Sequence, residues 1–450
     1  MRLALVNPAW SFEGSIYFGC REPHFPLELA YAEALLKAAG HEAVIIDGQA
    51  RALSLAEMRA EVEAFRPDAI VITTAPSYLF WRCAPPELRC PIEALRALQG
   101  TAEITIAVGP HASTTPRAVM RKLGVDAAVL GECEEALVTL AETPRERWRT
   151  IDGIALREGD TVHIQGRPRA VEMARLPALR FRQADVAAHA HHHHRFDATP
   201  EGPGAEIEAS RGCPYHCTFC AKDNFRDRFR RRPLPLVLEE LDGLLEQGVR
   251  YVYFVDEIFL PDRSLLEALK TRGVKFGVQL RIDTWSRPLL DLLGEAGCVS
   301  IEAGVESVTS EGRSLLQKHC KTSTADLIDL LVHAKQVIPF VQANLLDGKT
   351  DEPADVRAFR DELLAHGVWA NEPVPLFPYP GSPEYTVRFG LPDDEAWERA
   401  VSYYLRHHVR WSDIQEAHPL PLDILERVLE SGEGGLGGGP ERAEPAAEAP

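Results

Sequence analysis

The sequence predicts an α/β protein of two units, an N-terminal doubly wound, Rossmann-like domain and a partial (β/α)6 barrel of the TIM type. A chain of 450 residues is too long for one ordinary core. Short β-branched runs alternate with helical patterns over residues 1–143 and again over residues 205–390, which is typical of parallel sheets with helical crossovers. Near the start of the second series, three of the nine cysteines fall within eight residues.

The N-terminal domain is expected to contain five strands separated by amphipathic helices such as 27–39 and 55–65. The strands are expected at residues 2–7, 42–47, 69–74, 103–108 and 127–130. Ligands of doubly wound sheets bind beyond the carboxyl ends of the strands. The segments at three of these ends read NPA, TTAPS and GPHAS. Their small and hydroxyl side chains suit the close approach of a large ligand with a polar rim.

Residues 144–204 are expected to form a connector that holds a hairpin, 154–157 and 162–165, and an internal run of four histidines, His191–His194. The barrel is expected to be open, because only six βα units follow. Its strands are expected at 205–210, 251–256, 276–281, 300–304, 340–346 and 370–376. Its helices are expected at 234–247, 265–272, 289–296, 324–334 and 354–366.

A helical extension is expected over residues 391–430, with helices at 397–407 and 421–429. The remaining tail, 431–450, is rich in Gly, Pro, Glu and Ala and is predicted to be disordered.

The composition argues against several classes of function. Lys and Arg total 49 against 67 Asp and Glu, a net charge of −18, which disfavours general binding to nucleic acid or to an anionic membrane. No apolar run approaches the ~20 residues that span a bilayer. The N-terminus MRLALVNPAW lacks the features of a signal peptide, so the cytoplasm is the expected compartment. Clustered cysteines there are metal ligands more often than disulfides.

The cysteine triplet is the most specific feature of the chain. Cys213, Cys217 and Cys220 have the spacing CxxxCxxC directly after a predicted strand. Three thiolates on one loop can each hold one iron of a four-iron cube, and no fourth cysteine follows at ferredoxin spacing. Two alternatives are a zinc site completed by His216 and a chance grouping, although structural zinc loops usually pair two CxxC-like knuckles. The other six cysteines are scattered along the chain: Cys20, Cys83, Cys90, Cys133, Cys298 and Cys320.

Polar residues follow each predicted barrel strand, at the end where barrel enzymes gather their active sites. After the cysteine loop they are Asp256, Glu257, Arg281, Asp283, Glu302, Glu306, Asn344, Asp347, Tyr379, Gly381 and Ser382. Six strand ends in register favour an active site over coincidence.

The loop RGCPYHCTFC, with an aromatic residue before its last cysteine, resembles the signature of the radical S-adenosylmethionine (SAM) superfamily. The resemblance implies a [4Fe–4S] cluster on the three cysteines, whose open iron chelates SAM, and an electron donor such as flavodoxin or ferredoxin. It also implies SAM contacts, with Glu306 near the amine or ribose and Arg281, a planar guanidinium, on the carboxylate. The implied SAM-binding residues are Phe219, Asp256, Arg281, Glu306 and Lys318; each charged one could instead form a structural salt bridge.

A barrel of this kind behind a doubly wound domain resembles the cobalamin-dependent branch of the superfamily, over residues 1–385. The N-terminal motifs are VNP, PLELAYAEALLKAAGHEAVIIDG and VGPHAS…LGVDAAVLGECEEAL. The implied cobalamin contacts are Asn7, Pro8, Thr74, Ser77, Gly109, Pro110, His111, Gly131 and Glu132. The motif DxHxxG is missing, so His111 is not assigned to cobalt. The alternative is a flavodoxin-like domain that binds another ligand or none.

The resemblance implies a C-methyltransferase that uses methylcobalamin and a 5′-deoxyadenosyl radical on an unactivated carbon of a small biosynthetic metabolite. The rivals are a non-methylating enzyme of the same branch, which cyclises, contracts a ring or oxidises, and a non-catalytic corrinoid or iron–sulfur sensor. Two features stay open. The run His191–His194 is a solvated loop, a metal site or a cover. The cluster Arg226, Arg228, Arg230, Arg231 and Arg232 is a salt-bridged surface or an anion clamp.

Overall fold

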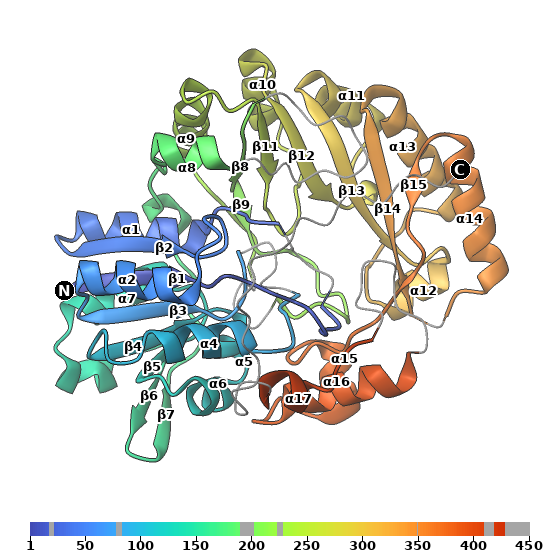
Figure 1. The fold of residues 1–450 in the computed structure, drawn as a ribbon. Coiled ribbons are helices and arrows are strands. Elements are labelled where there is room, and N and C mark those ends of the chain that lie inside the picture. Colours follow the sequence, from blue (N-terminus) through green and yellow to red (C-terminus); the bar gives the residue numbers. More distant parts are fainter. Residues whose placement is uncertain are drawn as a thin grey trace.

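The computed structural model describes residues 1–17, 22–77, 83–189, 202–222, 228–348, 350–408 and 418–427. Cys20, the run His191–His194, Arg226 and the tail 431–450 lie outside them. As expected from the sequence, the chain forms two parallel sheets with helices around them (Figure 1). The carboxyl ends of the strands of both sheets face a common central region.

The N-terminal sheet has the strand order β2-β1-β3-β4-β5-β6-β7. Its first five strands run parallel, and the order 2-1-3-4-5 is that of flavodoxin-like sheets. The bounds are β1 Arg2–Asn7, β2 Glu42–Asp47, β3 Ala69–Thr73, β4 Ile104–Val108, β5 Ala127–Val129, β6 Ile154–Glu158 and β7 Thr161–Gln165.

Helices cover both faces of this sheet because successive strand residues point to opposite sides. In β1, Leu3 and Leu5 belong to the core under α1 and α7, whereas Ala4 and Val6 belong to the core under α2, α4 and α6. The helix bounds are α1 Leu27–Ala38, α2 Leu55–Phe65, α4 Arg89–Ala97, α5 Pro110–Thr114, α6 Pro116–Leu123 and α7 Glu134–Glu142. The core under α1 and α7 continues without a break into the barrel.

The hairpin β6–β7 extends the N-terminal sheet and does not belong to a separate connector, where the sequence pattern placed it. β6 pairs antiparallel with β5. Its successive residues Ile154 and Ala155 point to opposite faces and enter the two different cores. The hairpin therefore covers the edge of β5. The short helix η1 Arg145–Thr150 precedes the hairpin, and the described segment from the hairpin to the barrel holds η2 Met173–Arg175 and α8 Gln183–Ala188.

The second sheet has the order β15-β14-β13-β12-β11-β8, with all pairs parallel. Among the described residues β8 and β15 do not pair, so the barrel is open, as predicted. The strands are β8 Gly204–Ile207, β11 Tyr251–Phe254, β12 Lys275–Leu280, β13 Cys298–Glu306, β14 Phe340–Asp347 and β15 Trp369–Ala370. The helices are α9 Leu234–Glu246, α10 Arg263–Arg272, η4 Ile282–Thr284, α11 Arg287–Glu295, α12 Ser310–Leu315, α13 Thr324–Val337 and α14 Pro353–Ala365.

The sixth barrel strand, expected over residues 370–376, is broken into β15 and β16 (Val374–Pro375). Both halves pair with β14, but the register advances by one extra residue between them, as in a β-bulge. At the break the side chain of Asn371 replaces the backbone: its Oδ1 accepts from Leu345 N at 2.7 Å, and its Nδ2 donates to Leu345 O at 3.0 Å. The strand pattern of the sequence did not indicate that the side chain of Asn371 would take over these backbone hydrogen bonds.

The C-terminal helices α15 Pro383–Phe389, α16 Ala396–His407 and α17 Leu422–Arg427 return from the barrel to the N-terminal domain (Figure 1). Lys122 of α6 pairs with Glu398 at 2.7 Å and with Glu426 at 2.5 Å, and Trp397 Nε1 donates to Thr115 Oγ1 at 3.1 Å. The extension therefore joins the barrel to the first domain a second time. Of the helices in the described residues, none is long and apolar enough to cross a membrane.

Candidate active site

The cysteine loop begins directly after a short strand, β9 (Ser210–Arg211). Cys213, Cys217 and Cys220 are all partly exposed and form no disulfide. Three separate elements hold the loop backbone. Gly212 N donates to Glu257 Oε2 at 2.7 Å, Thr218 N to Leu316 O at 3.0 Å, and Glu384 N to Thr218 O at 2.8 Å. The three thiols are thus presented at the carboxyl end of the barrel.

Two cations predicted for the site lie beside this loop. The guanidinium of Arg281 lies 3.8 Å from the centre of the Tyr215 ring and donates to both oxygens of Asp283, at 3.1 and 2.7 Å. Burial raises the pKa of Cys217, and the charges of Lys318 and Arg281 oppose that rise. Cations so placed stabilise thiolates, the form of cysteine that binds metals.

Lys318 is buried and pairs with Glu306, and its Nζ also donates to Gly304 O at 3.1 Å. Burial, reinforced by the charge of Arg281, lowers the pKa of Lys318 to about 8. The backbone here is strained. Of the five non-glycine residues with positive φ in the described ranges, three are Glu306, Gln317 and His319. Such strain gathers at functional sites, where the surrounding structure holds it in place.

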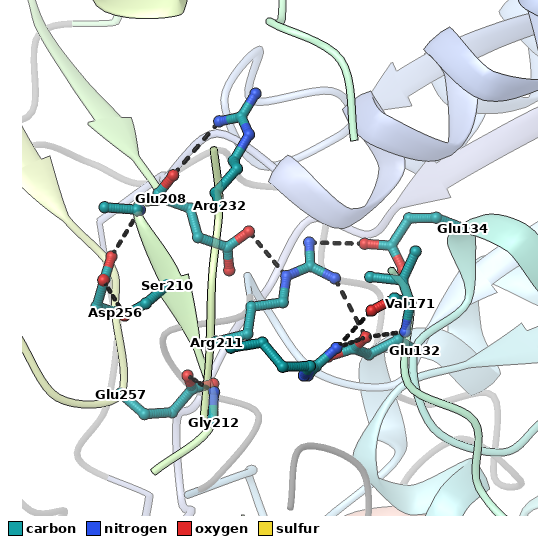
Figure 2. Close-up of polar contacts among 12 residues, drawn as sticks. Glu132, Glu134, Val171, Glu208, Ser210, Arg211, Gly212, Arg232, Asp256 and Glu257 are labelled. Carbon is teal, nitrogen blue, oxygen red and sulfur yellow. Dashed lines mark hydrogen bonds and ion pairs between the residues drawn. The ribbon is translucent and has the colours of Figure 1, made fainter. Parts of the chain in front are cut away.

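Asp256 follows β11, and its carboxyl group is bonded to residues of the segment after β8. It is 1% exposed, its Oδ1 accepts from Ala209 N at 2.9 Å, and its Oδ2 accepts from Ser210 Oγ. Burial raises its pKa to about 8. The next residue, Glu257, is the one bonded to the loop backbone (Figure 2). The contacts of Asp256 and of the partly exposed Phe219 with SAM therefore stay predictions.

The cysteines can be tested against the zinc alternative. Among the described residues, no three His, Cys, Asp or Glu side chains converge closely enough to hold one metal ion, and His216 is exposed. Ligands of three different irons lie farther apart than ligands of one ion. Three partly exposed thiols on one loop, with two cations beside them, therefore fit a cluster better than zinc.

Predicted cobalamin contacts lie together at the carboxyl ends of β1, β3 and β4, which are neighbours in the sheet. The hydroxyl groups of Thr73, Thr74 and Ser77 are buried and make no hydrogen bond within the described residues. Gly109 allows the Thr74 side chain to pack against its backbone, since an added Cβ would lie 2.6 Å from Thr74 Oγ1. Buried hydroxyls without partners cost free energy, so the edge is suited to a ligand that supplies the missing partners. Pro8 and Pro110 are buried at the same edge.

Two other predicted contacts, Asn7 and Gly131, already form hydrogen bonds in the protein, and a third, His111, is packed against an aromatic ring. The Asn7 amide donates to Asp47 Oδ1 at 2.9 Å and accepts from Trp10 Nε1 at 2.8 Å. The His111 ring packs on Trp397 with centres 4.4 Å apart, and burial lowers its pKa to about 3, so it is neutral. Gly131 N donates to Ser113 Oγ at 2.8 Å. Their contacts with cobalamin stay predictions.

Glu132 points toward the barrel and pairs with Arg230 at 2.6 Å. The neighbours of Arg230 in the arginine cluster are also paired. Arg231 pairs with Asp262 at 3.0 Å, and Arg232 pairs with Glu240 at 2.7 Å. These contacts favour the salt-bridged interpretation of the cluster over an anion clamp. The pairing of Arg230 with Glu132 was not predictable from sequence, because these two residues lie 98 positions apart in the chain.

Comparisons with known proteins agree with this geometry. A family model described as "B12 binding domain" matches residues 20–141, and one described as "Radical SAM superfamily" matches residues 207–359. An uncharacterized methyltransferase, PH0819 of Pyrococcus horikoshii, is 24% identical over 93% of this chain and 87% of that protein. The anaerobic magnesium-protoporphyrin IX monomethyl ester cyclase of Cereibacter sphaeroides is 26% identical over 78% of this chain and 58% of that protein.

Among solved structures, the radical SAM methyltransferase TsrM of Kitasatospora setae, with tryptophan and a SAM analogue bound, superposes with a TM-score of 0.67. The match has 20% identity and covers 85% of this chain and 74% of that one. At this identity the likeness establishes the fold.

Proposed function

The chain is a radical SAM enzyme with a B12-binding domain, and we propose that it is a C-methyltransferase that acts on an unactivated carbon of a small metabolite. The presence of these two domains implies three cofactors, a [4Fe–4S] cluster, SAM and cobalamin. The observation that carries the proposal is the placement of the cysteine loop. The loop lies at the carboxyl end of the barrel, and the hydroxyl-lined edge of the B12-binding domain faces the same region (Figure 1).

The residues of the chain supply position and charge. Bound SAM and cobalamin supply the electron acceptor and the transferable methyl group, and an external donor of the flavodoxin or ferredoxin type supplies electrons. Cys213, Cys217 and Cys220 would hold the cluster. Arg281 would orient the SAM carboxylate with its two parallel N–H groups, and Glu306, fixed by Lys318, would hold the amine or ribose.

A second candidate is a non-methylating reaction, such as cyclisation. The 26% identity with a cyclase of a porphyrin ester favours it. The two candidates make different use of SAM, because only methyl transfer converts SAM to S-adenosylhomocysteine.

The deciding experiment uses protein reconstituted without oxygen with iron, sulfide and hydroxocobalamin, then reduced and given SAM. We expect 5′-deoxyadenosine together with S-adenosylhomocysteine and the absorbance of methylcobalamin. If 5′-deoxyadenosine forms while neither methyl product appears, the methyltransferase proposal fails and the non-methylating candidate stands. With the substrate in hand, product mass should rise by one methylene.

A further inference from the structure

The cysteine loop is closed at its base by a two-stranded ribbon. β9 pairs antiparallel with β10 (Arg230–Arg231), with Arg211 opposite Arg230 and Ser210 opposite Arg231. All three cysteines lie between these two strands in the sequence. The ribbon therefore forms the base of the loop, and whatever fixes the ribbon fixes the loop's orientation.

Arg211 binds carboxylates from both domains. Its side chain is fully buried. Its Nε donates to Glu208 Oε2 of the barrel at 2.8 Å, and its terminal nitrogens pair with Glu134 at 2.8 Å and Glu132 at 3.6 Å (Figure 2). Glu132 and Glu134 belong to the B12-binding domain, between β5 and the first turn of α7.

Arg230, opposite Arg211 in the ribbon, grips the same carboxylate. Its two terminal nitrogens donate to the two oxygens of Glu132 at 2.9 and 2.6 Å, and one also donates to Val171 O at 2.7 Å. Glu132 is fully buried, and Arg230 is 20% exposed. A bidentate arginine–carboxylate pair fixes direction as well as distance.

Surface ion pairs contribute little to stability, and buried ones are costly to desolvate. A hydrophobic contact would join two domains at lower cost, and the core under α1 already does so. The ion pairs add a defined orientation of the ribbon relative to the B12-binding domain. They act two residues before Cys213 on one side, and three residues after the end of β5 on the other, where the edge of the B12-binding domain lies.

We propose that Glu132, Arg211 and Arg230 form an interdomain clamp, which sets the orientation of the cysteine loop relative to the B12-binding domain. Glu132 and Arg230 are positioning residues, since they act through the ribbon and the loop. By fixing the cysteine loop relative to the B12-binding domain, the clamp would hold the SAM site and the corrinoid site in the fixed relation that methylation of the corrinoid by SAM needs. This last step rests on the proposed function, whereas the orientation itself does not.

The test compares Glu132→Gln and Arg230→Gln with a matched control, Arg231→Gln. Arg231 is the neighbour of Arg230 on the same strand, but it pairs with Asp262 of the barrel at 3.0 Å and is 46% exposed. Each of the three changes replaces a charged side chain by the neutral amide of glutamine. Arg211→Gln is avoided, because losing a fully buried charge partner can prevent folding.

The first readout needs no turnover. In protein holding cob(II)alamin and the reduced cluster, both centres are paramagnetic, and their dipolar coupling in the electron paramagnetic resonance spectrum reports their separation and angle. We expect the coupling to change or broaden in Glu132→Gln and Arg230→Gln and to match the wild type in Arg231→Gln. Coupling unchanged in all three variants would overturn the proposal.

The second readout is the ratio of two products from SAM. In reduced protein, cleavage to 5′-deoxyadenosine needs only the reduced cluster and SAM, whereas methylation needs SAM and the reduced corrinoid correctly placed relative to each other. Misplacement by about 1 Å can cost on the order of 10²-fold, so we expect the ratio of methylation to cleavage to fall about tenfold or more in the two clamp variants. A parallel loss of both products would mean that the residues serve stability alone. Failure of the wild type to methylate the corrinoid would instead refute the proposed function, leaving the dipolar coupling to judge the clamp.

Discussion

The two sheets present different chemistry at their carboxyl ends. The barrel end carries charges that are already paired, Arg281 with Asp283 at 2.7 Å and Lys318 with Glu306. The end of the N-terminal sheet carries neutral hydroxyl groups, such as that of Thr74, which are buried and have no hydrogen-bond partner in the part of the chain that the structure describes. The difference indicates how each side would hold its ligand: the barrel by exchanging charge partners with a zwitterion, the N-terminal sheet by completing hydrogen bonds to a large, polar-rimmed ring.

The largest effect is expected when one of the three cysteines of the cluster site at the barrel end is replaced. In Cys217→Ala, the cluster should lose one of three iron ligands, and cleavage of SAM to 5′-deoxyadenosine should fall below detection. Iron and sulfide content and the visible absorbance of the reconstituted protein measure the loss. Cys320→Ser is the matched control, because Cys320 is partly exposed near Asp283 and lies outside the triplet. A cluster that survives in Cys217→Ala, or is lost in Cys320→Ser, would contradict the assignment.

The next effect tests the charged end as a SAM site. Arg281→Lys keeps the positive charge but loses the two parallel donors. A hydrogen bond to a charged group is worth about 1.5–3 kcal/mol, so we expect the KM for SAM to rise roughly tenfold to a hundredfold. Arg287→Lys serves as the control, since Arg287 forms an exposed pair with Asp329 on the outer helices. An unchanged KM in Arg281→Lys would show that the pair with Asp283 is structural.

A smaller effect tests the neutral end. Thr74→Val removes a buried hydroxyl that has no partner within the described residues. A neutral hydrogen bond contributes about 1 kcal/mol, so the Kd for hydroxocobalamin should rise about fivefold, while the stability of the apoprotein is unchanged or increased. Absorbance titration and urea unfolding measure the two quantities.

Thr105→Val should behave in the opposite way. Thr105 Oγ1 donates to Asp126 at 3.0 Å, so its loss should lower stability by about 1 kcal/mol and leave the Kd unchanged. If both threonine variants bind the corrinoid equally well, the hydroxyl-lined edge is not the binding surface.

The sequence predicted what depends on periodicity and on local spacing. The strands β1 and β2 have the expected bounds, and the polar residues after β12 and β13 do lie together beside the cysteine loop, because parallel strands share one edge. Long-range pairing was not predictable. Whether Asp256 or Glu257 reaches the loop depends on where the twisted strand ends. The pairing of Glu132 with Arg211 depends on how the domains dock, which no local pattern encodes.

The last prediction concerns stability and not activity, and it tests Asp256, a buried barrel carboxyl that resembles the neutral end. Its pKa of about 8 in the folded protein lies above its ordinary value of 3.8, so between these pH values the folded state holds a proton that the unfolded chain has lost. The free energy of unfolding should therefore fall as the pH rises from about 4 toward 8.

Asp256→Asn, a neutral mimic, should flatten this slope, and the gap between variant and wild type should shift in favour of the variant as the pH rises. Urea unfolding of the full-length apoprotein at pH 5.5, 6.5 and 7.5 measures it. Asp242→Asn is the control, because the hydrogen bond from Arg272 lowers the pKa of Asp242, so this group changes stability only below about pH 4. Parallel curves for Asp256→Asn and the wild type would mean that Asp256 is charged in the folded protein.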